Sequence, residues 1–177
     1  EVLAIGDELL HAGLVDTNSS YIASQLERLG VVVGRFTVVG DDPDDLHDAI
    51  DQACRRAVMV ICSGGIGPTL DDRTREVVAK VIGEPLRFDE AGWQQVLAWF
   101  TRMSRTAADS DRRQAEFPLS ATVLANPIGT APGVRVGVHG AELFALPGVP
   151  REMKVMLDQH VLPAAEALGE LTPTAQA

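Results

Sequence analysis

A glycine-rich loop between a buried strand and a helix constrains the fold of this chain more than any other feature. The loop, Ser63–Thr74, reads SGGIGPTLDDRT. It follows the apolar, β-branched run Val58–Cys62, which predicts a buried strand, and it leads into Arg73–Ile82, where apolar residues recur at helical spacing. Open α/β sheets bind their ligands at loops that leave the carboxyl ends of such strands.

The residues inside this loop favour a phosphorylated ligand. Glycines let backbone N–H groups approach a phosphate closely, and the N-terminus of the following helix favours an anion. Asp71 and Asp72 would repel that anion unless a divalent cation lay between them. The loop lacks the Gly-Lys-Ser/Thr of a Walker A motif and the register of a dinucleotide fingerprint. A structural interpretation stays open, in which the glycines serve a tight turn and Asp72 caps the helix.

Strands and helices alternate through the first half of the sequence. Strands are predicted at Val2–Ile5, Val31–Val39 and Val58–Cys62, and helices from Asp16 to Leu29 and from Pro43 to Ala57. This alternation favours a three-layer α/β/α fold with a mostly parallel sheet and helices on both faces.

The second half is less regular. Asp89 is expected to cap a helix that carries Trp93, Val96, Leu97 and Phe100, and the polar stretch 105–113 to form a mobile loop. Further expectations are a strand at Thr122–Leu124, a β-hairpin of Gly133–Val138 and Glu142–Leu146, and a last main helix from Pro150. Residues 1–168 are expected to form one domain, and 169–177 a tail or the start of a linker.

Composition excludes several classes of protein. The chain of 177 residues fits one domain, and no apolar run approaches the roughly 20 residues of a membrane span. A formal net charge of −10 argues against a nucleic-acid partner. The start does not resemble a signal peptide, and the missing initiator Met suggests trimming. Cys54 and Cys62 form no metal-spaced motif, so reduced thiols and a cytoplasmic location are expected.

Acidic residues follow each of the first three predicted strands. They are Asp7 and Glu8, then Asp41 and Asp42, then Asp71 and Asp72. The carboxyl ends of parallel strands share one edge of a sheet, so these acids should converge on one crevice and suit a hard divalent cation. The alternative for the group around Pro43 is that acids at a helix start are favourable by roughly 0.3–1 kcal/mol each.

Two further loops have unusual composition. Asn126–Gly133 reads NPIGTAPG, with Asn126 and Thr130 as hydrogen-bonding groups, and a rigid structural turn is the alternative interpretation. Pro147–Pro150 precedes the last helix and resembles a second cradle for a phosphate or ribose, with Arg151 as a nearby cation. None of the four histidines has a partner that suggests a metal site, so they are expected at the surface.

These motifs, in this order, resemble the N-terminal domain of the competence/damage-inducible protein CinA family. The similarity covers about residues 2–160; His11-Ala12 departs from it, which leaves the shape of the first loop open. It implies a molybdopterin-binding-like fold and a homo-oligomer. It also implies hydrolysis of a nucleoside diphosphate linkage, with ADP-ribose giving AMP and ribose 5-phosphate, and a divalent metal ion (Mg, Mn or Co) as cofactor.

The resemblance also assigns roles to residues. Asp41 and Asp72 match the acids that serve the metal and phosphates, and they are the expected metal ligands and catalytic groups. Asp7, Glu8 and Asn18 match the first ligand-facing loop, where Asp7 or Glu8 would orient the water or contact the ribose. The remaining matches, expected to bind the ligand, are Gly64, Gly65, Gly67, Thr69, Gly129, Thr130, Pro147, Gly148 and Arg151.

The sequence therefore predicts a metal-dependent nucleotide pyrophosphatase that acts on an ADP-ribose-like small molecule. Two alternatives stay open. One is a molybdopterin- or nucleotide-binding module without chemistry of its own. The other is a nucleotidyltransferase-like protein of molybdenum cofactor biosynthesis. Neither nucleic acid nor membrane is an expected partner.

Overall fold

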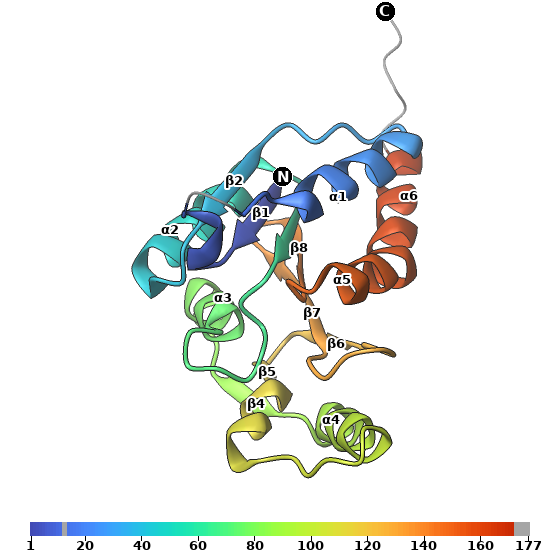
Figure 1. Ribbon diagram of the computed structural model, residues 1–177. Coiled ribbons are helices and arrows are strands. Elements are labelled where there is room, and N and C mark those ends of the chain that lie inside the picture. The colour runs from blue at the N-terminus through green and yellow to red at the C-terminus, as the bar shows by residue number, and fades with distance from the viewer. Residues whose placement is uncertain (12–13, 172–177) are drawn as a thin grey trace, which may run out of the picture.

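The computed structural model describes residues 1–11 and 14–171 and has a six-stranded sheet as its centre (Figure 1). The strand order is β2-β1-β3-β8-β7-β6. The strands are β1 (Val2–Ile5), β2 (Phe36–Val39), β3 (Met59–Ser63), β6 (Thr122–Leu124), β7 (Gly133–Val138) and β8 (Ala141–Leu146). Strands β2, β1, β3 and β8 are mutually parallel, while β7 runs antiparallel to β8 and β6. The predicted mostly parallel sheet with a hairpin is confirmed.

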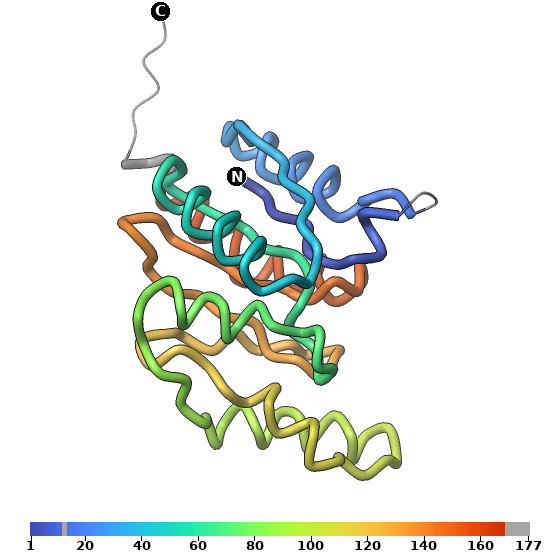
Figure 2. Tube along the Cα trace, turned by 90° about the vertical axis from the view of Figure 1, so that its left-hand side faces the viewer, coloured from blue at the N-terminus to red at the C-terminus, as the bar shows by residue number. Residues whose placement is uncertain are grey.

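Helices cover both faces of this sheet, which confirms the three-layer prediction (Figures 1 and 2). One face carries α2 (Pro43–Arg56) and α3 (Thr74–Ile82), whose Ile50 and Val78 are fully buried. The other face carries α1 (Thr17–Arg28), α5 (Pro150–Met156) and α6 (Leu162–Leu171), with a π-helical turn at Leu157–Val161 between the last two. Cys54 and Cys62 are buried, free thiols.

Aspartate caps fix the start of several helices, and that of Asp89 was predicted from the sequence. The side chains of Asp16, Asp42 and Asp89 accept hydrogen bonds from backbone N–H groups in the first turns of α1, α2 and α4 (Glu90–Arg102). Gly30 has a φ of 77° after the last residues of α1, the left-handed conformation expected of a glycine there.

The second predicted strand is shorter than expected. Residues 31–35 are not part of β2, and Val32 is 85% exposed. The ladder between β1 and β2 begins with the pair Val2 and Phe36, and residues 31–35 belong to no ladder. The β-branched run Val31–Val33 has strand propensity, but no ladder extends to it.

Two features of the second half of the chain differ from expectation. The stretch 105–113, expected as a mobile loop, runs into the 3-10 helix η2 (Asp109–Ala115), in which Asp111 and Gln114 are buried. A small antiparallel pair, β4 (Leu86–Phe88) with β5 (Glu116–Pro118), was not predicted, and it joins α4 to the rest of the molecule. The domain boundary at 168 stays a prediction; α6 continues to Leu171, and 172–177 lie outside the described residues.

No helix in the described part of the chain has the length and apolar character to cross a membrane.

Candidate functional site: a glycine-loop cleft

A cleft of about 590 Å³ lies at the carboxyl ends of β1, β3 and β8, where the sequence predicted a site. It collects loops that are far apart in the sequence. Its lining comprises Ile5, Gly6, Glu8, Asp41, Gly64, Gly65, Ile66, Gly67, Pro68, Thr69, Asp71, Asp72, Thr130, Ala131, Pro147, Gly148, Val149 and Glu152. The predicted convergence of loops from several strand ends is therefore present in the structure.

The glycines of the loop are required by the way it packs. Gly64 has a φ of 117° and Gly65 a φ of 67°, conformations that other residues rarely adopt. A Cβ on Gly64 would collide with the carbonyl oxygen of Ile5, and one on Gly65 with the hydroxyl of Thr74. That hydroxyl donates to the Gly64 carbonyl at 3.1 Å. The loop backbone therefore lies directly against β1 and the first residue of α3.

Three consecutive N–H groups of this loop have no protein partner. Those of Gly65, Ile66 and Gly67 donate no hydrogen bond to any residue that the structure describes, although all three residues line the cleft. The neighbouring N–H groups are used: Gly64 donates to Leu146 O at 2.9 Å and Thr69 to Asp72 Oδ2 at 2.8 Å. Successive unpaired N–H groups form a concavity that favours an anion.

Two arginine side chains hold carbonyl groups of the glycine loop. Arg75 donates to the carbonyls of Ile66 and Gly67, and Arg113 donates to the Thr69 carbonyl at 2.6 Å. Asp72 Oδ2 also accepts from the Thr69 hydroxyl at 2.6 Å. Asp72 is not the cap of α3: Arg73 occupies that position, without a side-chain cap. The helix-cap interpretation of Asp72 is thus wrong, and its carboxylate shapes the loop instead.

Asp41 and Asp7 join the first two loops by a reciprocal pair of hydrogen bonds. The Asp7 N–H donates to Asp41 Oδ2 at 3.1 Å, and the Asp41 N–H donates to Asp7 Oδ1 at 2.9 Å. Burial raises the pKa of Asp41; the bond from Asp7 N–H opposes this, and the charges of Asp7, Glu8 and Asp71 add to it. Asp41 is thus a carboxylate whose negative charge is disfavoured where it stands.

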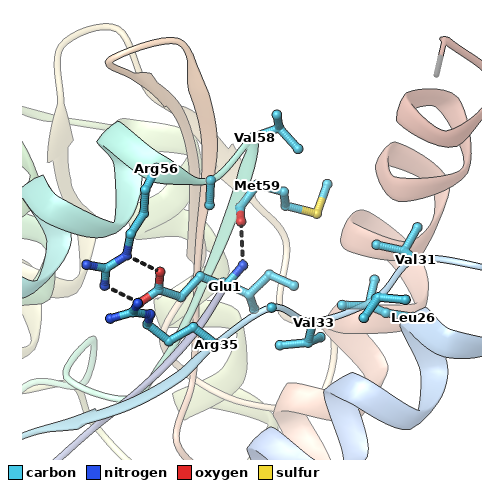
Figure 3. Close-up of a pocket in the computed structure, with 12 residues that line it drawn as sticks. Glu1, Leu26, Val31, Val33, Arg35, Arg56, Val58 and Met59 are labelled. Carbon is cyan, nitrogen blue, oxygen red and sulfur yellow. Dashed lines mark hydrogen bonds and ion pairs between the residues drawn. The ribbon is translucent and has the colours of Figure 1, made fainter.

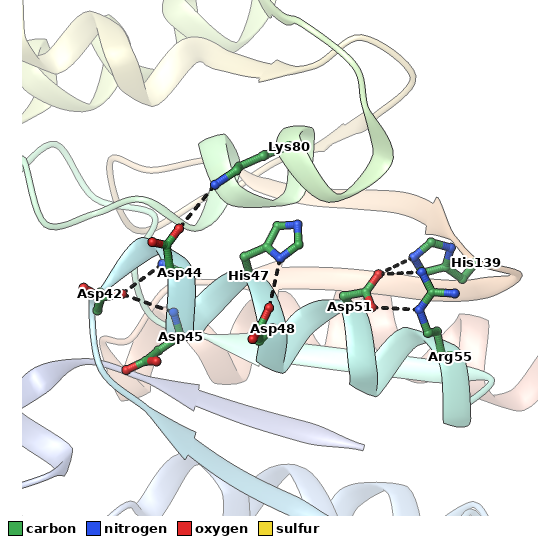
Figure 4. A network of polar contacts seen from close by, with 9 residues as sticks. All are labelled: Asp42, Asp44, Asp45, His47, Asp48, Asp51, Arg55, Lys80 and His139. Carbon is green, nitrogen blue, oxygen red and sulfur yellow. Dashed lines mark hydrogen bonds and ion pairs between the residues drawn. The ribbon is translucent and has the colours of Figure 1, made fainter.

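The other acids of this segment serve α2 (Figure 4). Asp42 Oδ1 accepts from the N–H groups of Asp44 and Asp45 as the helix cap. Asp44 pairs with Lys80 at 3.4 Å, and Asp51 contacts both Arg55 and the His139 ring at 2.7 Å. Arg55 first, and then His139, lower the pKa of Asp51 to about 2. Asp41 is the acid of this group that lines the cleft.

The cleft is acidic. Five carboxylates line it, from Glu8, Asp41, Asp71, Asp72 and Glu152, and no lysine or arginine is among its described lining residues. No three metal-ligating side chains gather into one site in the described part of the chain. Isolated carboxylates beside an anion cradle fit Mg²⁺-like ions, which are held by one or two carboxylates together with ligand phosphates.

Beside the cleft, Asn18 contacts Gly148. The Asn18 amide donates to Ser63 Oγ at 2.9 Å and to the Gly148 carbonyl at 2.8 Å. Asn18 itself lines a smaller cavity of about 230 Å³ that shares Ile5, Glu8 and Gly148 with the cleft. A Cβ on Gly148 would meet only the Gly64 Cα, at 3.5 Å. The fold therefore does not require glycine at position 148.

Glu152, which sequence reasoning missed, anchors the Asn126–Gly133 loop. Buried Asn126 donates to Glu152 Oε2 at 2.8 Å and accepts from the Gly129 N–H at 2.9 Å. A side chain on Gly129 would collide with the Glu152 carboxylate. Of the two predicted residues here, Thr130 lines the cleft and Gly129 only supports the loop. Arg151 is exposed and is absent from the lining.

Arg75 was also missed, although the sequence carries a signal for it. It precedes Val78 by three positions and Ile82 by seven, so it belongs to the inward stripe of α3. An arginine on such a stripe needs partners inside the protein. Here those partners are the carbonyls of the glycine loop.

A second cavity, of about 380 Å³, lies at the other end of the sheet (Figure 3). Its walls include Leu26, Val31 and Val33, and the Glu1 amino group donates to the Met59 carbonyl at 2.9 Å beside it. No glycine loop borders this cavity, and the candidate site residues all lie elsewhere.

Comparisons with known proteins agree with this geometry. Residues 1–167 match the family model described as probable molybdopterin binding domain. A CinA-like protein of Anaeromyxobacter dehalogenans is 45% identical over 172 residues, which are 97% of this chain and 42% of that protein. The chain thus spans about two fifths of the length of such relatives.

Two solved structures are similar to this one. CinA of Thermoplasma acidophilum, a protein of unknown function, has a TM-score of 0.81 and 36% identity over 92% of this chain and 95% of its own. The molybdopterin biosynthesis enzyme MoaB of Thermus thermophilus has a TM-score of 0.62 over 97% and 96% of the two chains, but only 20% identity. The second likeness concerns the fold alone, and it agrees with the predicted molybdopterin-binding type.

Proposed function

We propose that the cleft binds a small phosphorylated ligand, because this chain belongs to the family of probable molybdopterin-binding domains and to its CinA-like branch. The ligand class is molybdopterin or a nucleotide. The observation that carries the proposal is the row of unpaired N–H groups at Gly65, Ile66 and Gly67. A phosphate accepts such hydrogen bonds, whereas an uncharged ligand gains less from them.

The acidic lining refines the proposal. Phosphate and carboxylates repel each other, so an anion enters this cleft more readily together with a divalent cation. Asp41 and Asp72 would hold that cation jointly with the phosphate oxygens. When bound, the cation would neutralise phosphate charge and make a nearby water more acidic.

A second candidate function is hydrolysis of a diphosphate linkage, with ADP-ribose as substrate. It is favoured by the position of Asp41 in the cleft, because its pKa is raised by burial and this suits a group that takes up a proton. In this reaction the oxygen of a water bonds to one phosphorus and the bridging P–O bond breaks. The products are AMP and ribose 5-phosphate, and the protons of the water pass to the cleft carboxylates and to solvent.

Isothermal titration calorimetry tests the binding proposal. Pyrophosphate, ADP-ribose, AMP and molybdopterin are titrated into the protein with Mg²⁺ present, and adenosine serves as the ligand without phosphate. We expect binding of the phosphorylated ligands and not of adenosine. Equal affinity for adenosine and AMP would contradict a phosphate site.

Product analysis tests the second candidate. ADP-ribose is incubated with Mg²⁺, Mn²⁺ or Co²⁺, and AMP is measured by chromatography. Asp72→Asn keeps an oxygen that can accept from Thr69 but removes the charge, so the rate should fall at least about 100-fold, or roughly 2.7 kcal/mol of barrier. Tight ADP-ribose binding without AMP formation with any metal would leave a binding module as the function.

A further inference from the structure

One buried charge lies behind the glycine loop without an ion pair. Arg75, on α3, is 3% exposed. Its guanidinium donates to the carbonyl oxygens of Ile66 and Gly67, the second at 3.0 Å. No carboxylate of the described residues lies within ion-pair distance of it.

A buried guanidinium of this kind is unfavourable by itself. Arginine is almost never fully buried unless it is paired, because removing its charge from water is costly. Burial accordingly lowers the pKa of Arg75 to about 10, and the charge of Asp72 is the largest influence that opposes this shift. Arg75 remains protonated at neutral pH, so a net positive charge stays behind the loop.

One of these two carbonyls connects the charge to the anion cradle. The Ile66 carbonyl belongs to the same peptide group as the Gly67 N–H, which is one of the unpaired groups, whereas the Gly67 carbonyl belongs to the peptide group of Pro68, which has no N–H. Because the peptide between Ile66 and Gly67 is trans and Arg75 holds its carbonyl, its N–H points away from Arg75. The cleft side has no lysine or arginine among its described residues.

We infer that Arg75 is the positioning residue and permanent counter-charge of the phosphate site, and that it acts through the backbone of Ile66 and Gly67 without touching the ligand. The inference rests on the proposed phosphate binding and extends it: the ligand must place an anionic group over this loop. A bound phosphate then compensates the buried positive charge that the protein itself leaves unpaired.

Arg113 is the matched comparison. It also donates to a carbonyl of the loop, that of Thr69, but it is only half-buried and pairs with Glu76 at 2.7 Å. If Arg75 only holds the loop in place, its substitution should change pyrophosphate affinity as little as substitution of Arg113 does. If Arg75 is a counter-charge, its substitution should lower the affinity more, because the charge of Arg113 is already compensated by Glu76.

The test separates charge from hydrogen bonding with two variants of Arg75. Arg75→Lys keeps the positive charge, with its donors on a single nitrogen, and Arg75→Gln keeps a donor nitrogen but no charge. Pyrophosphate affinity is measured by calorimetry in Mg²⁺, and thermal melting checks folding. We expect Arg75→Lys to stay within a few-fold of wild type and Arg75→Gln to lose at least about tenfold, because Coulomb energies inside proteins are large at short range. Arg113→Gln should lose little.

Equal losses in Arg75→Lys and Arg75→Gln, or no loss in Arg75→Gln, would overturn the counter-charge. If the wild-type protein does not bind pyrophosphate, the proposed function itself fails, and that result is recorded before any variant is made. The two failures are therefore distinguishable.

A measurement on the wild-type protein covers the case in which the variants do not fold. In an NMR titration with pyrophosphate, the side-chain Nε–Hε resonance of Arg75 should shift together with the amides of Gly65, Ile66 and Gly67, and that of Arg113 should shift less. Amide shifts without movement of the Arg75 resonance would overturn the inference.

Discussion

Gly64 and Gly148 are neighbours in the lining of the cleft, but the two positions place different demands on the residue. Gly64 is required by its backbone, because it has a positive φ and a Cβ there would collide with Ile5. Gly148 has neither constraint, and a methyl group would lie in ordinary contact with the Gly64 Cα at 3.5 Å. Under the proposed function, glycine at 148 would leave space for the ligand.

Gly148→Ala should therefore keep its melting temperature within a few degrees of wild type and lose most of its affinity for ADP-ribose. Differential scanning fluorimetry and calorimetry measure the two properties. Gly137→Ala, on β7, is the control because open space surrounds its Cβ far from the cleft, and it should change neither property. A Gly148→Ala protein that binds normally would contradict the role of position 148.

Asp41 shows a conflict between stability and function at a single residue. Its pKa is raised in the folded protein, so its contribution to stability is present below the ordinary carboxyl pKa and is lost as pH rises through the raised value. At neutral pH its charge is therefore unfavourable. The substitution Asp41→Asn keeps a side-chain oxygen that can accept from the Asp7 N–H, since only the charge is removed.

Asp41→Asn should melt at a higher temperature than wild type near pH 7, and the difference should vanish below about pH 4, where carboxyls are protonated in both states. Its Mg²⁺-dependent affinity for pyrophosphate should fall. Asp45→Asn is the control: an exposed acid in the first turn of α2 favours the helix, so its loss should lower the melting temperature slightly. A lower melting temperature for Asp41→Asn would contradict the charge conflict.

At the scale of the element, the start of α2 separates two adjacent aspartates. Asp42 caps the helix through the N–H groups of Asp44 and Asp45, while Asp41 faces the cleft. Asp42→Ala should cost about 1 kcal/mol of unfolding free energy, the usual effect of losing a cap, and should change ligand affinity little. Urea denaturation and calorimetry measure these. An affinity loss as large as that of Asp41→Asn would show that the helix start belongs to the site.

At the scale of the whole molecule, charge decides how a phosphate can bind. The chain carries a formal charge of −10, and five carboxylates line the cleft. Long-range repulsion therefore opposes an anionic ligand, and in our proposal the loop N–H groups and Arg75 favour it. We expect the affinity for pyrophosphate to fall at least about tenfold in EDTA relative to Mg²⁺, as calorimetry would show. Equal affinity in both buffers would remove the bridging cation from the proposal.

The assembly of the molecule stays a prediction. The family resemblance implies a homo-oligomer, and β2 is an edge strand whose Phe36 is 52% exposed. Light scattering at micromolar concentration should give at least twice the mass of one chain. The mass of a single chain would contradict this expectation.

The sequence by itself determined the features that depend on near neighbours. Residues a few positions apart determine the alternation of strands and helices and the turn at His139-Gly140. They also determine the helix caps Asp16, Asp42 and Asp89. The position of the site was predictable for the same reason, because a glycine loop after a buried strand is a local pattern. Hence the glycine loop and the acids Asp41 and Asp72 were found at the cleft where they were expected.

Tertiary structure decided what depends on residues far apart in the chain. The start of β2 at Phe36 coincides with the start of its pairing with β1, and the contact of Asn18 with Gly148 joins positions 130 apart. The tertiary structure also places Glu152 in the cleft and Arg151 outside it. It directs the Arg75 side chain toward the carbonyls of the glycine loop. Residue type and local spacing leave these choices open, because burial and hydrogen-bond partners exist only once the sheet has brought the loops together.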